Sequence, residues 1–136
     1  MALAVVLTLL AGIPPPPYRY EEELDTRAAI QRFMREDQAI SARWHTLMED
    51  RQGLSFDQVA QALHSDVAAS YEHSFNELAA VQAGPGVPSR PTLLQLQTYA
   101  VARQEAALQA AQELRSRGAG HIVAPKASVP KSPDKP

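Results

Sequence analysis

The sequence predicts an all-α protein, folded as a three-helix antiparallel up-down-up bundle, and three observations support this prediction. Residues 18–52, 54–83 and 92–117 contain neither glycine nor proline. Glycine destabilises a helix interior by about 1 kcal/mol and proline by about 3 kcal/mol, so their exclusion from long segments is typical of helices. Apolar residues in these segments recur at helical spacing. The same segments are poor in strand-forming residues.

Length and composition limit the classes of protein to consider. A chain of 136 residues fits one domain, and 45% apolar with 21% charged residues is typical of globular proteins. The net charge is −2, whereas nucleic-acid-binding domains are usually strongly basic, so we expect no nucleic-acid partner. The absence of cysteine excludes disulfides, thiol nucleophiles and cysteine-ligated zinc.

The first helix is expected over residues 20–51. Its apolar residues fall on one stripe with two methionines beside it: Ile30, Phe33, Ile40, Trp44 and Leu47, then Met34 and Met48. The short connection around Gly53 predicts that the next helix packs antiparallel to this one. Trp44, Phe33 and Phe75 are expected to be core residues, and an exposed partner-binding stripe is the alternative.

The second helix is expected over residues 56–83, and its start is well defined. Ser55 and Gln58 fit a capping box, in which each side chain satisfies a free backbone N–H of the other residue. Leu54 and Val59 fit the hydrophobic staple that often accompanies such a box. The apolar stripe then runs through Phe56, Val59, Leu63, Val67, Tyr71, Phe75 and Leu78.

The third helix is expected over residues 91–117, after a reversal rich in glycine and proline. Pro91 suits the first turn of a helix, where a missing N–H is not needed. Gly118 follows two arginines and is expected to cap the helix end. Its stripe is rich in alanine, which favours close packing, and contains Leu93, Leu96, Ala100, Ala107, Ala111 and Leu114. We therefore expect the bundle to occupy residues 18–118.

Residues 119–136 are expected to form a disordered tail. The range contains four prolines, all three lysines of the chain and few large apolar residues. Such a segment cannot bury enough apolar surface to offset the entropy of ordering.

Residues 1–17 are expected to form an apolar segment followed by a polyproline spacer. Residues 2–13 are uncharged and mostly Leu, Val and Ala, and residues 14–17 are all proline. About twelve apolar residues are too few to cross a bilayer alone, and the basic region of a signal peptide is missing. Three interpretations stay open: a degenerate export signal, the end of a membrane helix, and a segment buried against the bundle.

The residues that follow the spacer are acidic. Glu21, Glu22, Glu23 and Asp25 follow a single nearby arginine, Arg19. Basic residues next to a membrane segment favour the cytoplasmic side, so their scarcity favours an extracytoplasmic bundle. We expect a membrane-associated or exported protein, with contact to the membrane through residues 2–13.

Two charged residues interrupt the apolar stripes at a similar height. Asp37 lies between Phe33 and Ile40, and Arg103 lies between Ala100 and Ala107. The expected structural polar pair is therefore Asp37–Arg103, buried or half-buried, with Tyr71 or Tyr99 able to add a hydrogen bond. In this interpretation the pair sets the register of the helices. Independent solvation of the two charges and a ligand-binding role are the alternatives.

The sequence predicts no catalytic residue, no cofactor and no metal site. No nucleophile elbow, phosphate-binding loop or His-Glu-x-x-His motif is present. His64 and His73 are nine residues apart, which places them on opposite faces of one helix. His45 and His64 could approach across the antiparallel pair, but surface histidines do so by chance. We therefore expect the protein not to be an enzyme.

The order of several short motifs provides a family resemblance. The motifs are the apolar run that ends at residues 14–18, Ile30-x-x-Phe33, Gly53-Leu54-Ser55, Asp66-Val67 and Tyr99-x-x-x-Arg103, within residues 5–117. This order resembles the helical accessory domain appended to bacterial rhomboid-type intramembrane proteases. The serine between glycines that marks the protease itself is absent, so the resemblance implies only the non-catalytic part.

These observations together favour a non-catalytic, membrane-tethered or exported helical module that binds another protein. The alternative is a soluble helical chaperone, adaptor or inhibitor-like binding protein. The identity of the partner and the oligomeric state stay open.

Overall fold

The computed structural model describes residues 18–51 and 53–131, with side chains as far as residue 119. Its elements are α2 (Tyr20–Glu49), α3 (Phe56–Ala62), the π-helical segment η1 (Leu63–Ala68), α4 (Ala69–Ala79) and α5 (Arg90–Lys131). All regular secondary structure in this described part is helical, which confirms the predicted all-α class. Since α3, η1 and α4 follow one another without a break, the chain has three long helical segments.

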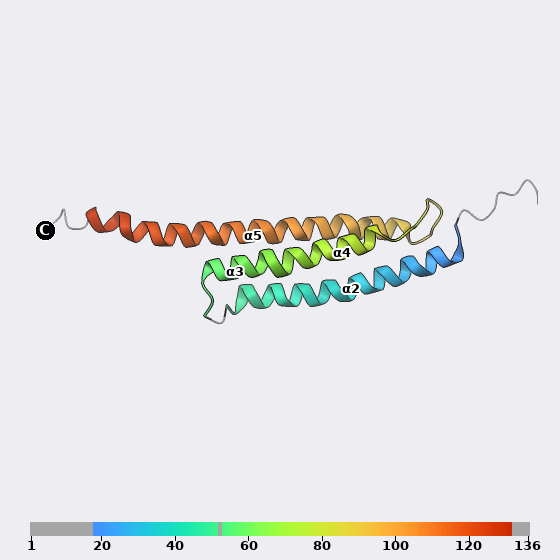
Figure 1. Ribbon diagram of the computed structural model, residues 1–136, viewed down its shortest axis with the longest axis horizontal. Helices are drawn as coiled ribbons and strands as arrows, with labels where there is room; N and C mark the ends of the chain where they lie inside the picture. Colours follow the sequence, from blue (N-terminus) through green and yellow to red (C-terminus); the bar gives the residue numbers. More distant parts are fainter. Residues whose placement is uncertain (1–17, 52, 132–136) are drawn as a thin grey trace, which may run out of the picture.

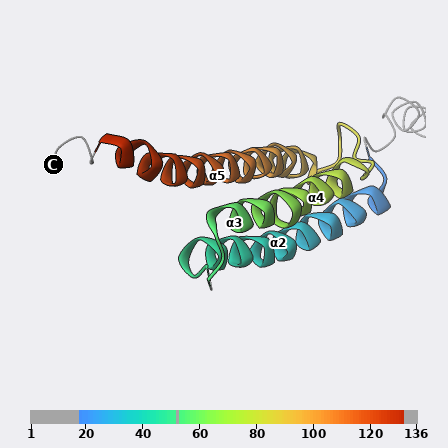
Figure 2. The same ribbon diagram turned by 60° about the vertical axis from the view of Figure 1, so that its left-hand side comes forward.

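The segment formed by α3, η1 and α4 packs against both α2 and α5. Figures 1 and 2 show it between the other two helices, with the chain turning back after α2 and again after α4. The helices α2 and α5 contact each other less extensively than each contacts the middle segment. The helices α2 and α5 still touch directly, since Tyr99 donates to Asp37 and Arg103 donates to Ser41.

The start of α3 has the predicted capping box. The Ser55 hydroxyl accepts a hydrogen bond from the Gln58 backbone N–H at 3.1 Å, and the Gln58 side chain accepts one from the Ser55 N–H at 2.8 Å. The preceding connection turns at Gly53, whose φ of +79° lies in the left-handed region that favours glycine. The first helix ends at Glu49, two residues earlier than expected.

The predicted uninterrupted helix over residues 56–83 is wrong in two respects, because it contains a π-helical segment and ends at Ala79. Leu63, Val67 and Tyr71 are all fully buried although they are four residues apart. In an α-helix each such step advances about 40° beyond a full turn, so the stripe would drift away from the core. The wider π turn reduces this drift and keeps Tyr71 on the same buried face as Leu63 and Val67.

The connection between α4 and α5 is held by the first turn of α2. The buried Glu23 carboxylate accepts hydrogen bonds from the Ser89 N–H at 2.9 Å, the Ser89 hydroxyl at 2.7 Å and the Arg27 guanidinium at 2.6 Å. The hydrogen bonds from Ser89 lower the pKa of Glu23, against the opposing effect of burial. Glu22 also accepts a hydrogen bond from the Gly84 N–H at 3.3 Å. Two of the four acidic residues next to the spacer thus hold a loop.

The apolar core consists of two clusters, one toward each end of the packed helices. The first holds Ile40, Val59, Ala60, Leu63, Val67, Ala68, Tyr71, Ala107, Ala111 and Leu114. The second holds Ala29, Phe33, Leu78, Leu93 and Ala100. The stripe alanines of α5 are fully buried, as the prediction of close packing requires.

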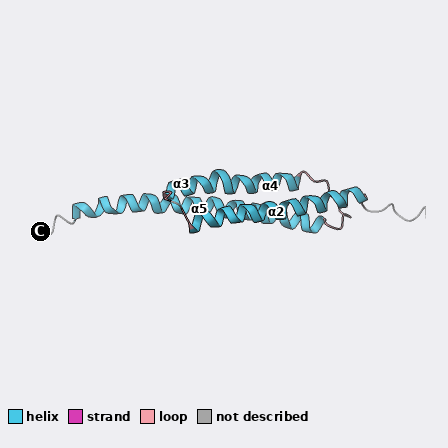
Figure 3. Ribbon diagram, turned by 90° about the horizontal axis from the view of Figure 1, so that it is seen from below, coloured by secondary structure: helices cyan, strands magenta, loops and turns pink. Residues whose placement is uncertain are grey.

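The third helix does not end at Gly118, and this prediction is wrong. A Cβ at Gly118 would lie 3.5 Å from the Cβ of Phe56 and 3.7 Å from Asp57 Oδ1. The glycine therefore lies beside the first turn of α3 inside a continuing helix. Residues 119–131, expected to be disordered, continue α5 to Lys131, and Figure 3 shows this part extending past the other helices. Residues 132–136 lie outside the described residues.

The N-terminal segment of residues 1–17 also lies outside the described residues, so its three interpretations stay predictions. Within residues 18–51 and 53–131, every helix is too short or too polar to cross a membrane.

Candidate functional site

A polar and aromatic cluster lies midway along the helices, between the two apolar clusters. Its members come from all three helical segments: Asp37, Ser41 and Trp44 from α2, Tyr71 from α4, and Tyr99 and Arg103 from α5. We refer to these six residues as the Asp37–Arg103 cluster. The helical spacing explains the position, because the two charged residues replace apolar residues of the stripes at the same height.

The Asp37 carboxylate accepts hydrogen bonds from three hydroxyl groups. The Tyr71 hydroxyl donates to Oδ1 at 2.6 Å, and the Tyr99 hydroxyl lies 3.0 Å from Oδ1 and 3.1 Å from Oδ2. The Ser41 hydroxyl, one helical turn further along α2, lies 3.4 Å from Oδ1. The carboxylate is therefore satisfied from α4 and α5 as well as from its own helix.

Arg103 donates hydrogen bonds to two of these three hydroxyl groups. Its Nε donates to the Tyr71 hydroxyl at 3.2 Å, and its Nη2 donates to the Ser41 hydroxyl at 3.1 Å. The guanidinium carbon lies 4.4 Å from the centre of the Trp44 ring, at a distance typical of a cation–π contact. Arg103 thus joins α5 to both of the other helical segments.

The structure brings the predicted pair, Asp37 and Arg103, together with Tyr71 and Tyr99. It corrects the prediction that the two charges contact each other directly. The ion pairs found among the described residues do not include Asp37–Arg103. The Tyr71 hydroxyl lies between the two charges, because it donates to Asp37 while it accepts from Arg103. Both tyrosines thus take part, where the sequence suggested either.

Sequence reasoning missed the roles of Ser41 and Trp44. Ser41 follows Asp37 by four residues, and this spacing places the hydroxyl beside the carboxylate on one helix. The sequence predicts Trp44 to be a core residue, but it is half-buried and its ring lies against Arg103. Only the packing of α5 against α2 reveals this contact.

The cluster shifts the pKa values of its members so that their hydrogen-bonding roles persist at neutral pH. Burial raises the pKa of Tyr71, and the hydrogen bond to Asp37 raises it further. Burial and the Asp37 carboxylate raise the pKa of Tyr99 to about 12. Burial opposes the charge of Arg103, but its interactions with Tyr71, Tyr99 and Asp37 raise its pKa overall. The phenols therefore remain donors and the guanidinium remains charged.

The cluster opens to solvent on the side where α2 and α5 lie next to each other. Tyr71 is fully buried, whereas Tyr99 is 39% exposed and Arg103 and Trp44 are half-buried. Met34 and Met48 of α2 are 49% and 44% exposed. We refer to the surface made by Met34, Trp44, Met48, Tyr99 and Arg103 as the α2–α5 face.

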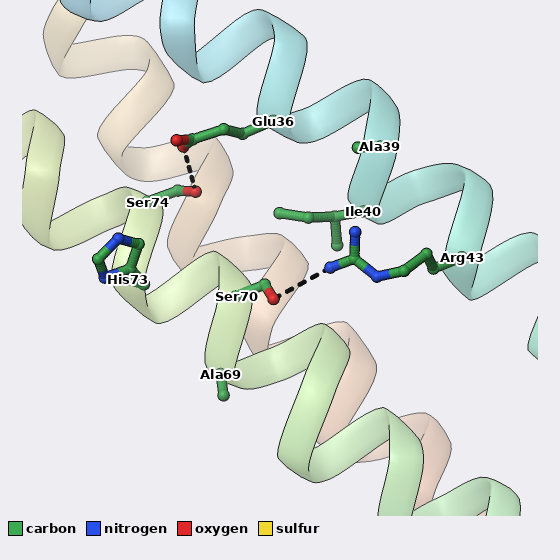
Figure 4. A pocket seen from close by; sticks show the side chains of 8 residues that line it. All are labelled: Glu36, Ala39, Ile40, Arg43, Ala69, Ser70, His73 and Ser74. Carbon is green, nitrogen blue, oxygen red and sulfur yellow. Dashed lines mark hydrogen bonds between the residues drawn. The ribbon is translucent and has the colours of Figure 1, made fainter.

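A second candidate is an open groove of about 350 Å³ between α2 and α4. Figure 4 shows its lining residues, Glu36, Ala39, Ile40, Arg43, Ala69, Ser70, His73 and Ser74. Its polar side chains bond mainly to one another: Ser74 donates to Glu36 at 2.7 Å, and Arg43 donates to Ser70 at 3.1 Å. Arg43 also forms two hydrogen bonds of 3.1 Å with Asp66. These contacts join α2 to the middle segment.

Within residues 18–119, no three His, Asp or Glu side chains lie close enough together to hold a metal ion. His73 lies 3.7 Å from Glu77 in a pair one helical turn apart. The side chain of His121 lies outside the described side chains.

Comparison of the chain with protein-family models, with curated proteins and with solved structures finds no match.

Proposed function

We propose that this protein is a non-catalytic helical module that binds another protein through the α2–α5 face. The observation that carries the proposal is the composition of this face: tryptophan, tyrosine, arginine and two methionines, half-buried or exposed together. Aromatic residues, methionine and arginine are enriched at the centres of protein interfaces. Tryptophan, tyrosine and arginine also contribute most of the binding energy there.

The Asp37–Arg103 cluster supports this proposal by fixing Trp44, Tyr99 and Arg103 within the face. Its hydrogen bonds connect α2, α4 and α5 through Asp37, Ser41, Tyr71, Tyr99 and Arg103. A side chain that is already fixed loses less conformational entropy on binding. The proposal includes an up-down-up arrangement of α2, the middle segment and α5 as the rigid support of the face.

The proposed setting is a membrane-tethered or exported protein, with residues 2–13 as the tether or export signal. This setting is consistent with the family resemblance to accessory domains of rhomboid-type proteases, which remains part of the proposal. A soluble adaptor or chaperone-like protein would use the same face, but it would not need the N-terminal segment outside the bundle.

The proposal is tested by recovering partners of the full-length, affinity-tagged chain from its native host after membrane fractionation. Met34→Lys and Tyr99→Ala should each reduce recovery of a specific partner by at least about tenfold, because a charge or a cavity at an interface centre weakens binding. Leu94→Lys is the matched control, since Leu94 is 41% exposed and lies at the start of α5. Equal recovery with all variants would contradict the proposed face, and recovery only in the soluble fraction would favour the soluble adaptor.

A further inference from the structure

We infer that the α2–α5 face pairs with the same face of a second copy of this chain, with the two α2 helices antiparallel. The inference rests on the proposed function, because it assigns an occupant to the face described there. It is carried by a stripe of uncharged residues along α2 and by the equal distance of its two end methionines from the central residue.

The stripe contains Met34, Gln38, Ser41, His45 and Met48. Their spacings alternate between four and three residues, which is the heptad spacing of the contact seam between two paired helices. Four of the five side chains are exposed, and Ser41 is half-buried. The stripe is therefore a second seam on α2, beside the one that faces the core.

The five residues of the stripe bring no like charges together when two copies approach, and the Arg103 guanidinium that bonds to Ser41 belongs to a cluster that also contains the Asp37 carboxylate. None of its five residues is a carboxylate, a lysine or an arginine, although 21% of the residues of the chain are charged. Like charges brought together across an interface oppose association strongly. A strongly acidic or basic partner would find no opposite charge on the stripe. The stripe of a second copy is itself uncharged and needs no opposite charge.

The two methionines at the ends of the stripe are equally distant from its central residue. Met34 and Met48 lie seven residues before and after Ser41, which is about 10 Å along the helix in each direction. A closed dimer with a two-fold axis brings the same patch of both copies together. An axis beside Ser41 therefore places Met34 of one copy opposite Met48 of the other, twice in each dimer.

The same axis places an acidic residue opposite the histidine of the stripe. His45 of one copy lies at the height of Asp37 of the other, because both are four residues from Ser41. Trp44 and Tyr99 border the stripe and would be covered by the second copy. Methionine side chains are flexible and adapt to such contacts.

Disulfide trapping tests the pairing, because the natural chain contains no cysteine. Full-length Met34→Cys and Met48→Cys chains are mixed and gently oxidised, and the cross-linked peptides are identified by mass spectrometry. The mixed disulfide, which joins position 34 of one chain to position 48 of the other, should exceed both like-with-like disulfides by about tenfold or more. A mixture of Leu24→Cys and Leu94→Cys chains, oxidised in the same way, is the control. The mixed 34–48 disulfide should exceed the disulfides of this control by the same factor. Leu24 and Leu94 are 45% and 41% exposed, so these controls match in accessibility.

Sedimentation of the wild-type chain, up to about 100 µM, provides the second measurement. A dimer of the 14.8 kDa chain should form as concentration rises, and Met34→Lys should abolish it while circular dichroism stays unchanged.

Trapping no stronger than in the control, or a predominance of like-with-like disulfides, would overturn the inference. Association that Met34→Lys leaves intact would overturn it too, by assigning the contact to another part of the chain. A monomer that still recovers a different protein through the face would overturn the inference alone and leave the proposed function standing.

Discussion

At the scale of single residues, the structure explains why Asp37 and Arg103 interrupt the apolar stripes. Neither charge is buried without a partner, because the hydroxyls of Tyr71 and Ser41 lie between them and satisfy both. Chains of hydrogen bonds that begin and end on charged groups polarise one another and strengthen the network. The sequence indicated which charges would meet, but the hydroxyl between them depends on the rotation of α4, which no local pattern in the sequence determines.

The bridging role of Tyr71 predicts unequal coupling energies in double-mutant cycles. Asp37→Ala should destabilise the protein by about 1–3 kcal/mol, because it leaves the buried Tyr71 hydroxyl without its acceptor. The coupling measured for Asp37→Ala with Tyr71→Phe should exceed that for Asp37→Ala with Arg103→Leu, since only the first pair is in direct contact. Urea unfolding of the single and double variants measures both. Additivity in the Tyr71 cycle would show that the hydrogen bond contributes nothing.

The raised pKa of Tyr99 predicts a loss of stability at alkaline pH. Its pKa is about 12 in the folded protein against an ordinary 10.0, so the folded state retains a proton that the unfolded state releases. The stabilisation is fully present below pH 10 and is lost as the pH rises toward 12. Thermal unfolding between pH 9 and about 11.5 should therefore show a steeper decline for the wild-type chain than for Tyr99→Phe. Parallel declines would contradict this assignment.

At the scale of the elements, the start of α3 was predictable and the course of the second helical segment was not. Ser55 and Gln58 act through neighbours three residues apart, so their capping role is visible in the sequence. The π-helical segment η1 arises from the need to bring Leu63, Val67 and Tyr71 against the other two helices, which is a tertiary effect. The place of Gly118 is a tertiary effect as well, because its neighbour Phe56 is distant in sequence.

The π turn predicts that α3–α4 tolerates the loss of one residue at a specific place. A π-helical segment holds one residue more than the α-helical turn it replaces, so deletion of the exposed Ser65 should convert η1 to α-helix with the flanking stripes still aligned. Deletion of the exposed Glu72 from the regular part of α4 should instead rotate one side of the helix by about 100°. Thermal unfolding followed by circular dichroism should show a cooperative transition for the first deletion only. Equal loss of cooperativity would contradict the role assigned to η1.

At the scale of the whole molecule, the sequence predicted an all-helical domain because glycine and proline separate long amphipathic segments. The composition of each segment indicated that it is helical. The positions of Asp37 and Arg103 indicated how far along the helices the polar cluster lies. The open side of the cluster, with Trp44 half-buried, could not be predicted, since it depends on how closely α2 and α5 approach each other.

The packed part of the molecule predicts which truncations the fold tolerates. Removal of residues 119–136 should leave the melting temperature within about 2 °C of the wild type, because Gly118 is beside the first turn of α3 and later residues extend past the other helices.

Removal of residues 1–17 should leave a folded, more soluble protein if that segment is an anchor or an export signal. A clear drop in melting temperature after the second truncation would instead support the interpretation that the segment is buried against the bundle.

Amide hydrogen exchange of the full-length chain shows whether this protein binds through the α2–α5 face. Exchange is compared between the chain alone at low concentration and the chain in its purified complex, whether with a second copy or with a different protein. Binding at this face should slow exchange in residues 34–48 of α2 and 95–106 of α5, and should leave the exposed side of α3 and α4 unchanged. Slower exchange confined to α4 and the groove around His73, with no change in residues 34–48 and 95–106, would show that binding takes place elsewhere on the molecule.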